Sequence, residues 1–444
     1  MCSGSILGKM LLFALPLMCS SLLQLLFNAA DIIVVGRYAG DNSLAAVGSN
    51  SALINLLTNL FLGLSVGANV LVARYFGARQ QKDLKETVHT AMALSLYSGV
   101  ILTVVGCVGA RRILIWMDTP EDVLVLATLY LRIYFLGMTA MMLYNFGSAI
   151  LRAIGDTRRP LYYLSAAGVI NVVLNLVFVI IFRWDVAGVA AATVISQCIS
   201  AFLIIRCMVK EQSDIRLELS GLHVYADKFK RILQIGLPAS FQGFVFSFSN
   251  VIIQSSVNSF GAVVVAGNSA AANIEGFVYV SMNAFHQAAI SFTSQNVGAA
   301  KYERVNRILY TAELCVVMVG VVFGNLAVLF GYPLLSLYTS STAVMEAGMK
   351  RLVIICRYYA LCGMMDVVVG SLRGLGYAVM PMIVSLIGAC GLRLLWIFTF
   401  FRMDAFHTTT SLYLTYPVSW IVTFLTHVVC FIIVRRRLRR VWAG

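Results

Sequence analysis

The sequence predicts an all-α integral membrane protein with twelve transmembrane helices in two pseudo-symmetric six-helix bundles. First, 60% of its 444 residues are hydrophobic and only 12% are charged, about half the charge of a soluble domain. Second, apolar runs of ~20 residues or more, enough to cross a bilayer, recur along the chain. Third, landmarks of the first half return in the second. A soluble globule cannot bury this much apolar surface, and an outer-membrane barrel would alternate over ~10 residues.

The apolar runs follow one another with short polar connections. The first run, between Lys9 and Cys19, is similar to a signal peptide, but Leu17 and Met18 are too large for its cleavage site, so we take it as a span. Several runs exceed one bilayer thickness, which permits tilt. We expect the ten cysteines to be small packing residues. The expected spans are 10–36, 44–73, 88–110, 121–150, 160–182, 187–209, 231–258, 263–297, 308–331, 348–372, 380–402 and 411–434.

An internal repeat divides the chain. A shift of 221 residues places landmarks of the first six spans on those of the last six, in order. Because six is even, both halves cross in the same sense, and the pseudo-twofold axis stands along the membrane normal. We therefore expect an N-terminal bundle over 1–209, a cytoplasmic linker over 210–230 and a C-terminal bundle over 231–444. The matching landmarks are Gly40 and Gly261, Gly77 and Gly298, Gly99 and Gly320, Arg152 and Arg373, and Gly155 and Gly376.

The positions of the basic residues predict the orientation. With the N-terminus in the cytoplasm, the inner loops, the linker and the C-terminal tail receive most of the 33 Lys and Arg residues. We expect both termini in the cytoplasm and the chain in a bacterial inner membrane. The net charge of +14 then reflects topology and attraction to lipid headgroups, and no nucleic-acid partner is predicted. The outer side receives Arg37, Arg111, Arg112, Arg183, Lys350, Arg351 and Arg402.

Motifs for ATP-driven transport and for catalysis are missing from the sequence. There is no GxxxxGK[S/T] loop and no HExxH, and the one GxSxG, at 63–67, lies inside a span, where small residues serve helix packing. We expect neither an enzyme nor a cofactor. A membrane enzyme would need a catalytic cluster at one face, and a receptor or scaffold would not explain buried acids within a repeat. Two repeated bundles predict a secondary transporter, powered by an ion gradient or by the gradient of the substrate.

Ionisable side chains inside a bilayer are costly, so each marks a candidate site. Asp31 is the strongest candidate, ~9 Å below the outer boundary at Arg37 at 1.5 Å per residue. Asn175 and Asn171, one turn apart in the fifth span, and Thr193 in the sixth reach a similar depth. Oxygen ligands around a carboxylate suit a proton or a hard cation such as Na⁺. We therefore predict a coupling site here and no other metal site.

The landmarks resemble those of the MATE family, the multidrug and toxic compound extrusion antiporters, over essentially the whole chain. The major facilitator superfamily is also built from six plus six spans, but its acidic-basic motif between spans two and three is absent. The residues that carry the resemblance are Ala14-Leu15-Pro16, Asn28-Ala29-Ala30-Asp31, Val35-Gly36, the stretch Leu151 to Arg158, Asn171, Asn175, Ile235-Gly236-Leu237-Pro238, the stretch Gln295 to Ala299, and the stretch Leu372 to Gly376.

The resemblance implies a cation site made by Asp in span one, Asn and Asp in span five and Thr in span six. The matching positions are Asp31, Asn171, Asn175 and Thr193. Asn175 departs from the aspartate that is frequent there, and the single remaining carboxylate makes proton exchange at least as well founded as Na⁺ binding. In the family a bend of span one is linked to protonation. Pro16, which removes a backbone hydrogen bond in mid-span, is the candidate for that bend, with a static kink as the alternative.

The resemblance also implies a second acidic pair, in spans seven and ten. Span seven has no acid and offers Gln242, whereas Asp366 takes the place in span ten. Glu275 in span eight is outside the pattern. Arg393 lies at a similar depth and can pair with either acid, so a coupling role and a structural ion pair both stay open. Glu313, near the cytoplasmic start of span nine, is expected to snorkel or to pair with a nearby arginine, Arg304 or Arg307.

Aromatic residues and methionines in spans seven and eight would suit amphipathic organic cations, although we favour packing for most of them. We predict a cation-coupled antiporter that exports organic, cationic or amphipathic compounds in exchange for H⁺ or Na⁺ by alternating access, working as a monomer among membrane lipids. The alternative is a lipid-linked oligosaccharide or polyprenyl-glycan flippase, which often has extra helices and a basic cavity. The residues concerned are Phe244, Phe246, Phe248, Tyr279, Met282 and Phe285, with His286 and His427 as interior histidines.

Overall fold

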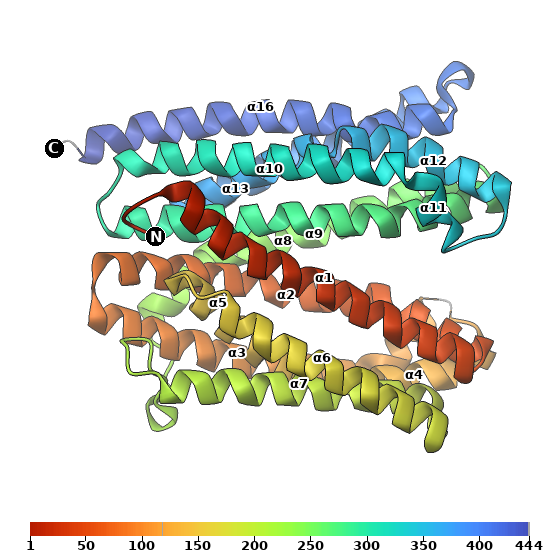
Figure 1. The fold of residues 1–444 in the computed structure, drawn as a ribbon, viewed down its shortest axis with the longest axis horizontal. Coiled ribbons are helices and arrows are strands. Elements are labelled where there is room, and N and C mark those ends of the chain that lie inside the picture. Colours follow the sequence, from red (N-terminus) through yellow and green to blue (C-terminus); the bar gives the residue numbers. More distant parts are fainter. Residues whose placement is uncertain (118, 443–444) are drawn as a thin grey trace. The chain divides into compact units, whose positions relative to one another are not determined.

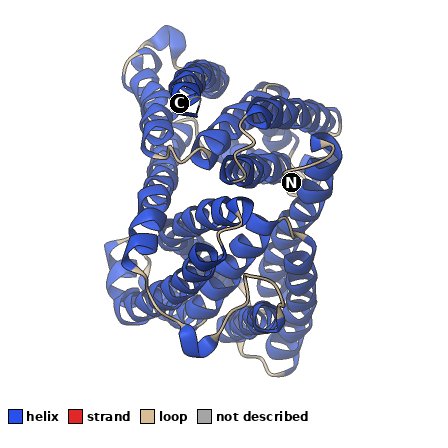
Figure 2. Ribbon diagram, turned by 90° about the vertical axis from the view of Figure 1, so that its left-hand side faces the viewer, coloured by secondary structure: helices blue, strands red, loops and turns tan. Residues whose placement is uncertain are grey.

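The computed structural model describes residues 1–117 and 119–442, and within them every regular element is a helix (Figure 2). The first half contains α1 (Ile6–Tyr38), α2 (Asp41–Ala78), α3 (Gln81–Trp116), α4 (Glu121–Leu136), α5 (Met138–Ile154), α6 (Arg158–Leu176), the π-helix η1 (Val177–Ile181) and α7 (Asp185–Lys210). After the short η2 (Leu219–Gly221) come α8 (Ala226–Asn258), α9 (Ala262–Gly298), α10 (Glu303–Leu329), α11 (Gly331–Ser336), α12 (Thr342–Arg357), α13 (Tyr359–Gly374), α14 (Val379–Ser385), the π-helix η3 (Leu386–Gly391), α15 (Leu392–Phe398), η4 (Phe400–Arg402), η5 (Asp404–Phe406) and α16 (Thr409–Trp442).

The predicted fold class is confirmed. Ten continuous helical segments, some of which join several of these elements, are long and apolar enough to span a membrane. Two bent helix pairs also pass this test when each pair is taken as one span, which gives up to twelve spans. Each predicted run coincides with one span. Spans four and ten are the bent pairs: α4 and α5 meet at 46°, and α12 and α13 meet at 45°. The amino-acid sequence shows these two only as continuous apolar runs, because a bend does not interrupt hydropathy.

By the packing of their Cα atoms, the residues form two compact units. We call residues 19–240 the N-unit, and residues 1–18 together with 241–444 the C-unit (Figure 1). Helices α1 and α8 therefore contribute to both units. The predicted bundle boundaries at 209 and 231 stay a prediction, since they describe the sequence repeat rather than this division by packing.

The repeat is visible in backbone geometry as well as in sequence. Gly40 and Gly261, 221 positions apart, precede α2 and α9 with φ of 87° and 90°. Gly155 and Gly376 have φ of 101° and 97°. These positive φ values are readily adopted only by glycine, because a Cβ would clash with the backbone. Glycine is thus required at these positions because the same helix ends, each with a positive φ, occur in both halves.

A close helix contact is repeated with the same spacing. A Cβ added at Gly99 of α3 would lie 2.5 Å from Cα of Thr139 in α5, and one at Gly320 of α10 would lie 2.7 Å from Cα of Ala360 in α13. Both distances are too short for any side chain. In lipid, where apolar association gains little from burial, such small residues permit the backbone approach that holds helices together.

Within the N-unit, α2 packs against α3, α4 and α5, and α7 packs against α4, α5 and α6. The GxSxG segment of α2 serves helix packing, as predicted, in this case against α8: a Cβ at Gly63 would lie 2.4 Å from the backbone nitrogen of Ser240. Within the C-unit, α9 packs against α10, α12 and α13, and α16 covers α12 and α13. Phe13 at the start of α1 meets Phe292 of α9 edge to face at 5.6 Å. All ten cysteines are free thiols.

Candidate functional site

The N-unit brings together three of the four residues predicted for the coupling site. Asn171 and Asn175 are one turn apart on the same face of α6, and both are buried. Their side-chain amides donate hydrogen bonds to the same oxygen, Oδ1 of Asp31 in α1, over 3.1 Å in the case of Asn171. The depth estimates from sequence agree with this arrangement, although they did not determine which helix faces were turned toward each other.

A small residue positions the two helices. A Cβ at Gly168 of α6 would lie 1.8 Å from the ring of Phe27 in α1, so the ring packs directly against the glycine. Phe27 precedes Asp31 by four residues and Gly168 precedes Asn171 by three, so the contact lies about one turn from the hydrogen bonds. The glycine therefore lets α1 approach α6 closely enough for the carboxylate to reach both amides.

The same cluster contains acceptors that lack a donor. The side-chain oxygens of Asn171 and Asn175 are buried without a hydrogen-bond partner. An unsatisfied buried acceptor costs about 1–3 kcal/mol, and native structures contain few of them. Two orphan amide oxygens beside a carboxylate are the kind of donor set that a hard cation accepts. The residues present thus fit a cation, and equally a proton on the carboxylate.

Thr193, the fourth predicted member, donates its hydroxyl hydrogen bond to the carbonyl of Val189 in its own helix, at 3.0 Å. Among the described residues, no hydrogen bond joins it to Asp31, so its part in the site stays a prediction. The helix α1 continues through Pro16 without interruption. A role of Pro16 in bending this helix stays a prediction, because a bend between two conformations is not tested by one of them.

In the C-unit, Glu275 of α9 has a partner that sequence reasoning did not predict. Arg351 of α12 donates two parallel hydrogen bonds to its carboxylate, each 2.7 Å long, and a third to Oδ1 of Asn268 at 2.6 Å. The guanidinium also lies 5.5 Å from the ring centre of Tyr416. Arg351, whose predicted location on the outer side is not tested by its burial, is only 7% exposed. A bidentate pair of this kind neutralises the acid and fixes its orientation.

The ion pair borders a cavity of about 280 Å³ inside the C-unit. Amide side chains and large aromatic rings share its wall with the ion pair. Such a mixture of apolar area with a few directed polar groups is typical of small-molecule sites. The lining residues are Asn250, Ile253, Gln254, Val257, Asn268, Ala272, Glu275, Arg351, Ile355, Tyr359, Tyr416 and Trp420.

Asp366 of α13 lies in a separate polar group. Its carboxylate accepts a long hydrogen bond of 3.4 Å from the hydroxyl of Tyr279, and its backbone carbonyl accepts one of 2.6 Å from Nδ1 of His286. Gln242, the candidate of span seven, accepts a hydrogen bond of 2.8 Å from the guanidinium of Arg373. Gln242, His286 and Arg373 are buried, whereas Asp366 and Tyr279 are half-buried.

Two predicted pairings are wrong within the described part of the chain. Arg393 forms no ion pair with Glu275 or Asp366; it donates to the hydroxyl of Ser419 at 2.9 Å and lies 4.4 Å from the ring centre of Tyr416. Glu313 forms no ion pair with a neighbouring arginine, and both of its carboxylate oxygens are buried without a hydrogen-bond partner. Similar depth in the membrane did not bring these side chains together, because depth says nothing of the direction in which a helix face points.

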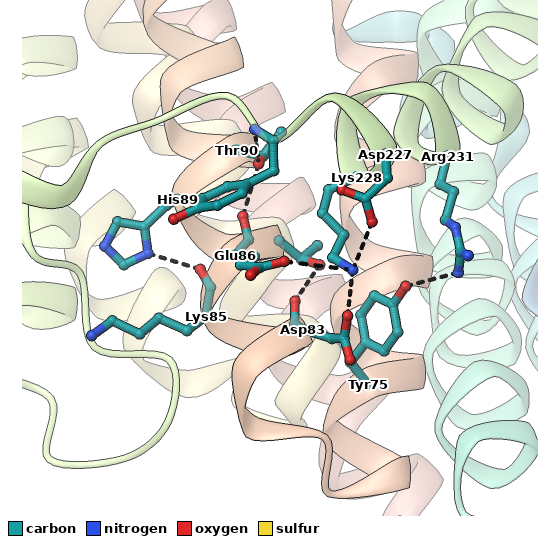
Figure 3. A network of polar contacts seen from close by, with 11 residues as sticks. Tyr75, Asp83, Lys85, Glu86, His89, Thr90, Asp227, Lys228 and Arg231 are labelled. Carbon is teal, nitrogen blue, oxygen red and sulfur yellow. Dashed lines mark hydrogen bonds and ion pairs between the residues drawn. The ribbon is translucent and has the colours of Figure 1, made fainter.

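A polar network that the sequence did not reveal lies at the start of α3 and α8 (Figure 3). The ammonium group of Lys228 donates to Asp83 and lies 2.9 Å from Asp227 and 3.7 Å from Glu86. It also lies 4.9 Å from the ring centre of Tyr75. The side chain of Lys228 is only 4% exposed, so this is a buried cation satisfied by three carboxylates.

The linker after α7 is held to α3 by neighbouring contacts. His89 donates from Nδ1 to the carbonyl of Lys85 at 2.8 Å, and its Nε2 accepts from the backbone N–H of Glu218 at 3.1 Å. The hydroxyl of Thr90 accepts from the backbone N–H of Tyr225 at 3.1 Å. The linker predicted from charge alone is thus an ordered segment, anchored at two points on one helix.

A second ion pair ties the end of α7 to the start of α6. Arg159 donates to Glu211 at 2.6 Å and also to Asp156, whose carboxylate accepts the backbone N–H groups of Arg158 and Arg159. The hydrogen bond from Arg159 lowers the pKa of Glu211 below its ordinary value. The sequence did not predict this pairing, because Arg159 and Glu211 are 52 residues apart in the chain.

Comparison with known proteins gives consistent matches over the whole length. The family model described as MatE matches residues 16–177 and again residues 238–399, once in each half. Two relatives from Bacillus subtilis (strain 168) are the probable multidrug resistance protein YoeA, 28% identical over 88% of this chain and 86% of its own, and the probable multidrug resistance protein YpnP, 28% identical over 88% and 87%. A solved multidrug resistance MATE transporter of the MOP superfamily, in its outward-facing conformation, superimposes with a TM-score of 0.91 at 22% identity over 98% and 97% of the two chains.

Proposed function

Because this chain belongs to the MatE family, we propose that it is a multidrug efflux transporter that exports amphipathic organic cations in exchange for H⁺ or Na⁺. Two relatives bear names of multidrug resistance proteins, and the superposed structure is a multidrug transporter. The flippase alternative has no support among these relatives. A secondary mechanism is consistent with a sequence that contains no ATP-binding loop.

The observation that carries the coupling proposal is the cluster around Asp31. Its carboxylate accepts from two buried amides, whose own oxygens have no donor. A bound cation would satisfy those oxygens, and a proton would neutralise the carboxylate. Either event changes the hydrogen bonds between α1 and α6, so it can favour one conformation of the transporter over another.

The single carboxylate favours H⁺ as the first candidate for the coupling ion. Asn175 contributes an amide where the family often has a second acid, which lowers the negative charge available for Na⁺. Binding of the ion at Asp31 and of the drug elsewhere would be linked, and the linkage must be reciprocal: whatever the ion does to drug affinity, the drug does to ion affinity. We further propose a monomer with both termini in the cytoplasm of a bacterial inner membrane, as the distribution of basic residues indicates.

Efflux from liposomes tests this proposal. Purified protein is reconstituted, a fluorescent organic cation is loaded, and a pH gradient or a Na⁺ gradient is imposed separately. We expect efflux driven by the pH gradient in the wild type and its loss in Asp31→Asn. Asp185→Asn, the same chemical change at an exposed position of α7, is the matched control and should transport like the wild type.

Each outcome has a defined meaning. Transport that follows only the Na⁺ gradient would overturn H⁺ as the coupling ion and retain Asp31 as the site. Gradient-driven efflux that persists in Asp31→Asn would remove coupling from this cluster. Folded wild-type protein that responds to neither gradient, over a panel of organic cations, would contradict cation-coupled export itself.

A further inference from the structure

A second cavity of the C-unit, of about 390 Å³, is lined mainly by residues of α10 and α16. Asn306, Tyr310 and Glu313 line it from α10 at intervals of one turn, and Phe424 and Phe431 line it from α16. Val368 of α13 also borders it. Its wall is mostly apolar, and its volume falls in the range of about 300–1,000 Å³ that accommodates small organic ligands.

Glu313 is the distinctive group of this cavity. Both of its carboxylate oxygens are buried, and neither has a hydrogen-bond partner. A single acid without donors is costly among apolar groups, and it persists in membrane proteins mainly where it has a function. The predicted arginine partners do not pair with it, and it lies outside the proposed coupling cluster at Asp31. Helix packing does not require a carboxyl group at this position either, so the acid has no role in the features described so far.

Two arginines of α16, Arg435 and Arg436, also line this cavity, and the contacts of Arg435 place it at the level of Asn306 rather than of Glu313. Arg435 donates to Oδ1 of Asn306 and to the carbonyl of Tyr302, both at 2.9 Å. Asn306 precedes Glu313 by seven residues, which is about 10 Å along a helix. The guanidinium is therefore engaged about two turns away, and the acid stays available to a ligand.

We propose that this cavity is a binding site for amphipathic organic cations with aromatic groups, held by Glu313. With the cation bound, the carboxyl of Glu313 is ionised, its proton having passed to water, and it supplies the opposite charge in a region of low dielectric, where that attraction is strong. Tyr310, Phe424 and Phe431 offer ring faces and edges to the aromatic groups of the ligand. The site lies in a different unit from Asp31, so drug binding and ion binding would occupy separate places. This inference rests on the proposed function for its choice of ligand class.

Equilibrium binding of tritiated tetraphenylphosphonium to the full-length protein in lipid nanodiscs tests the site without requiring transport. We expect Glu313→Gln to weaken binding at least tenfold and Glu313→Asp, which keeps the charge, to retain most of it. Glu303→Gln, the same change at an exposed position of α10, is the matched control and should bind like the wild type. Triphenylphosphine oxide, which keeps three rings but has no net charge, should bind Glu313→Gln and wild type equally. A photoreactive triphenylphosphonium should label residues 303–313 or 424–436.

Several results would overturn the proposal. These are equal affinity of Glu313→Gln and wild type, labelling confined to other segments, or native mass spectra in which a phospholipid occupies the protein and is lost in Glu313→Gln. A binding defect shared by Glu313→Gln and Glu313→Asp would also count against it, since the charge would then be irrelevant. If binding depends on Glu313 but the wild type shows no efflux, the proposed function is contradicted and this site is not. If the wild type shows efflux but binding does not depend on Glu313, this site is contradicted and the proposed function is not.

Discussion

Glu275 and Arg351 face each other through two parallel hydrogen bonds of 2.7 Å, although 76 residues separate them. Both residues are buried, at 5% and 7% exposure. In water such a pair would contribute little, but here each charge would be uncompensated without the other. The pair joins α9 to α12 beside the 280 Å³ cavity, so it fixes the wall of that cavity as well as the contact between two helices.

Removal of one partner should destabilise the C-unit strongly. We expect Arg351→Ala to lower the free energy of unfolding by roughly 3–5 kcal/mol, because it leaves a buried carboxylate unpaired. Thermal unfolding of detergent-solubilised protein measures the change. Lys85→Ala breaks an ion pair whose side chains are about half exposed, at 49% and 46%, and should change the melting temperature far less, because solvent screens the pair. Equal effects of the two variants would contradict the importance of burial.

Loss of Lys228 should release the linker from α3. In Lys228→Ala the carboxylates of Asp83, Glu86 and Asp227 would repel one another without their shared cation. We expect tryptic cleavage at the exposed Arg216 to become roughly several-fold faster, since local opening would cost less free energy. Lys230→Ala, at an exposed neighbouring position, should leave the rate unchanged. An unaltered rate in Lys228→Ala would show that the network does not hold the linker.

Acid should remove part of the stability that the Arg159–Glu211 pair provides. The hydrogen bond from Arg159 lowers the pKa of Glu211 from its ordinary 4.5. The folded state therefore binds this proton less readily than the unfolded state, so the contribution is present above about pH 4.5 and is lost as the pH falls below it. Glu211→Gln should show a shallower loss of melting temperature between pH 6 and pH 3.5 than the wild type. Asp214→Asn, an exposed change nearby, should follow the wild-type curve.

Two glycines of the C-unit should respond in opposite ways to the same substitution. Gly320→Ala would place a Cβ 2.7 Å from Cα of Ala360, and such overpacking costs about 1–3 kcal/mol. A Cβ at Gly276 meets no atom within 4 Å, so Gly276→Ala should be neutral or stabilise helix α9 by about 0.5–1 kcal/mol. Melting temperatures of the two variants check this. A neutral Gly320→Ala would mean that α10 and α13 can separate freely.

Asn175→Asp should change the ion preference of the proposed coupling site. The variant places a second carboxylate against the Asp31 cluster, and additional negative charge strengthens the binding of a hard cation. We expect a larger efflux response to a Na⁺ gradient than in the wild type, measured in the same liposomes. Asn175→Ala removes the amide without adding charge and separates the two effects. A Na⁺ response that stays unchanged in Asn175→Asp would contradict the proposed cation ligands.

Helix positions were predictable from the sequence because hydropathy is a local property. Each predicted run coincides with a span, and the 221-residue repeat paired Gly155 with Gly376, which the structure shows to have similar φ values of 101° and 97°. The common level of Asp31, Asn171 and Asn175 was also predictable from depth, whereas the hydrogen bonds between them were not, because depth does not say which helix faces meet. The bends within spans four and ten were not foreseeable, because hydropathy continues through them.

Which helix faces meet, however, was decided only by tertiary structure. The sequence placed Glu275, Asp366 and Arg393 at one depth and therefore allowed them to pair, but the packing of α9 against α12 turned Glu275 to Arg351 and left Arg393 to Ser419. The same holds for Lys228, whose acidic partners come mostly from another helix, and for Glu313, which received none. The sequence alone determined the fold class and the repeat, and it predicts a depth for each polar group. The rotation of each helix depends on contacts with helices distant in the chain, and only the folded structure determined it.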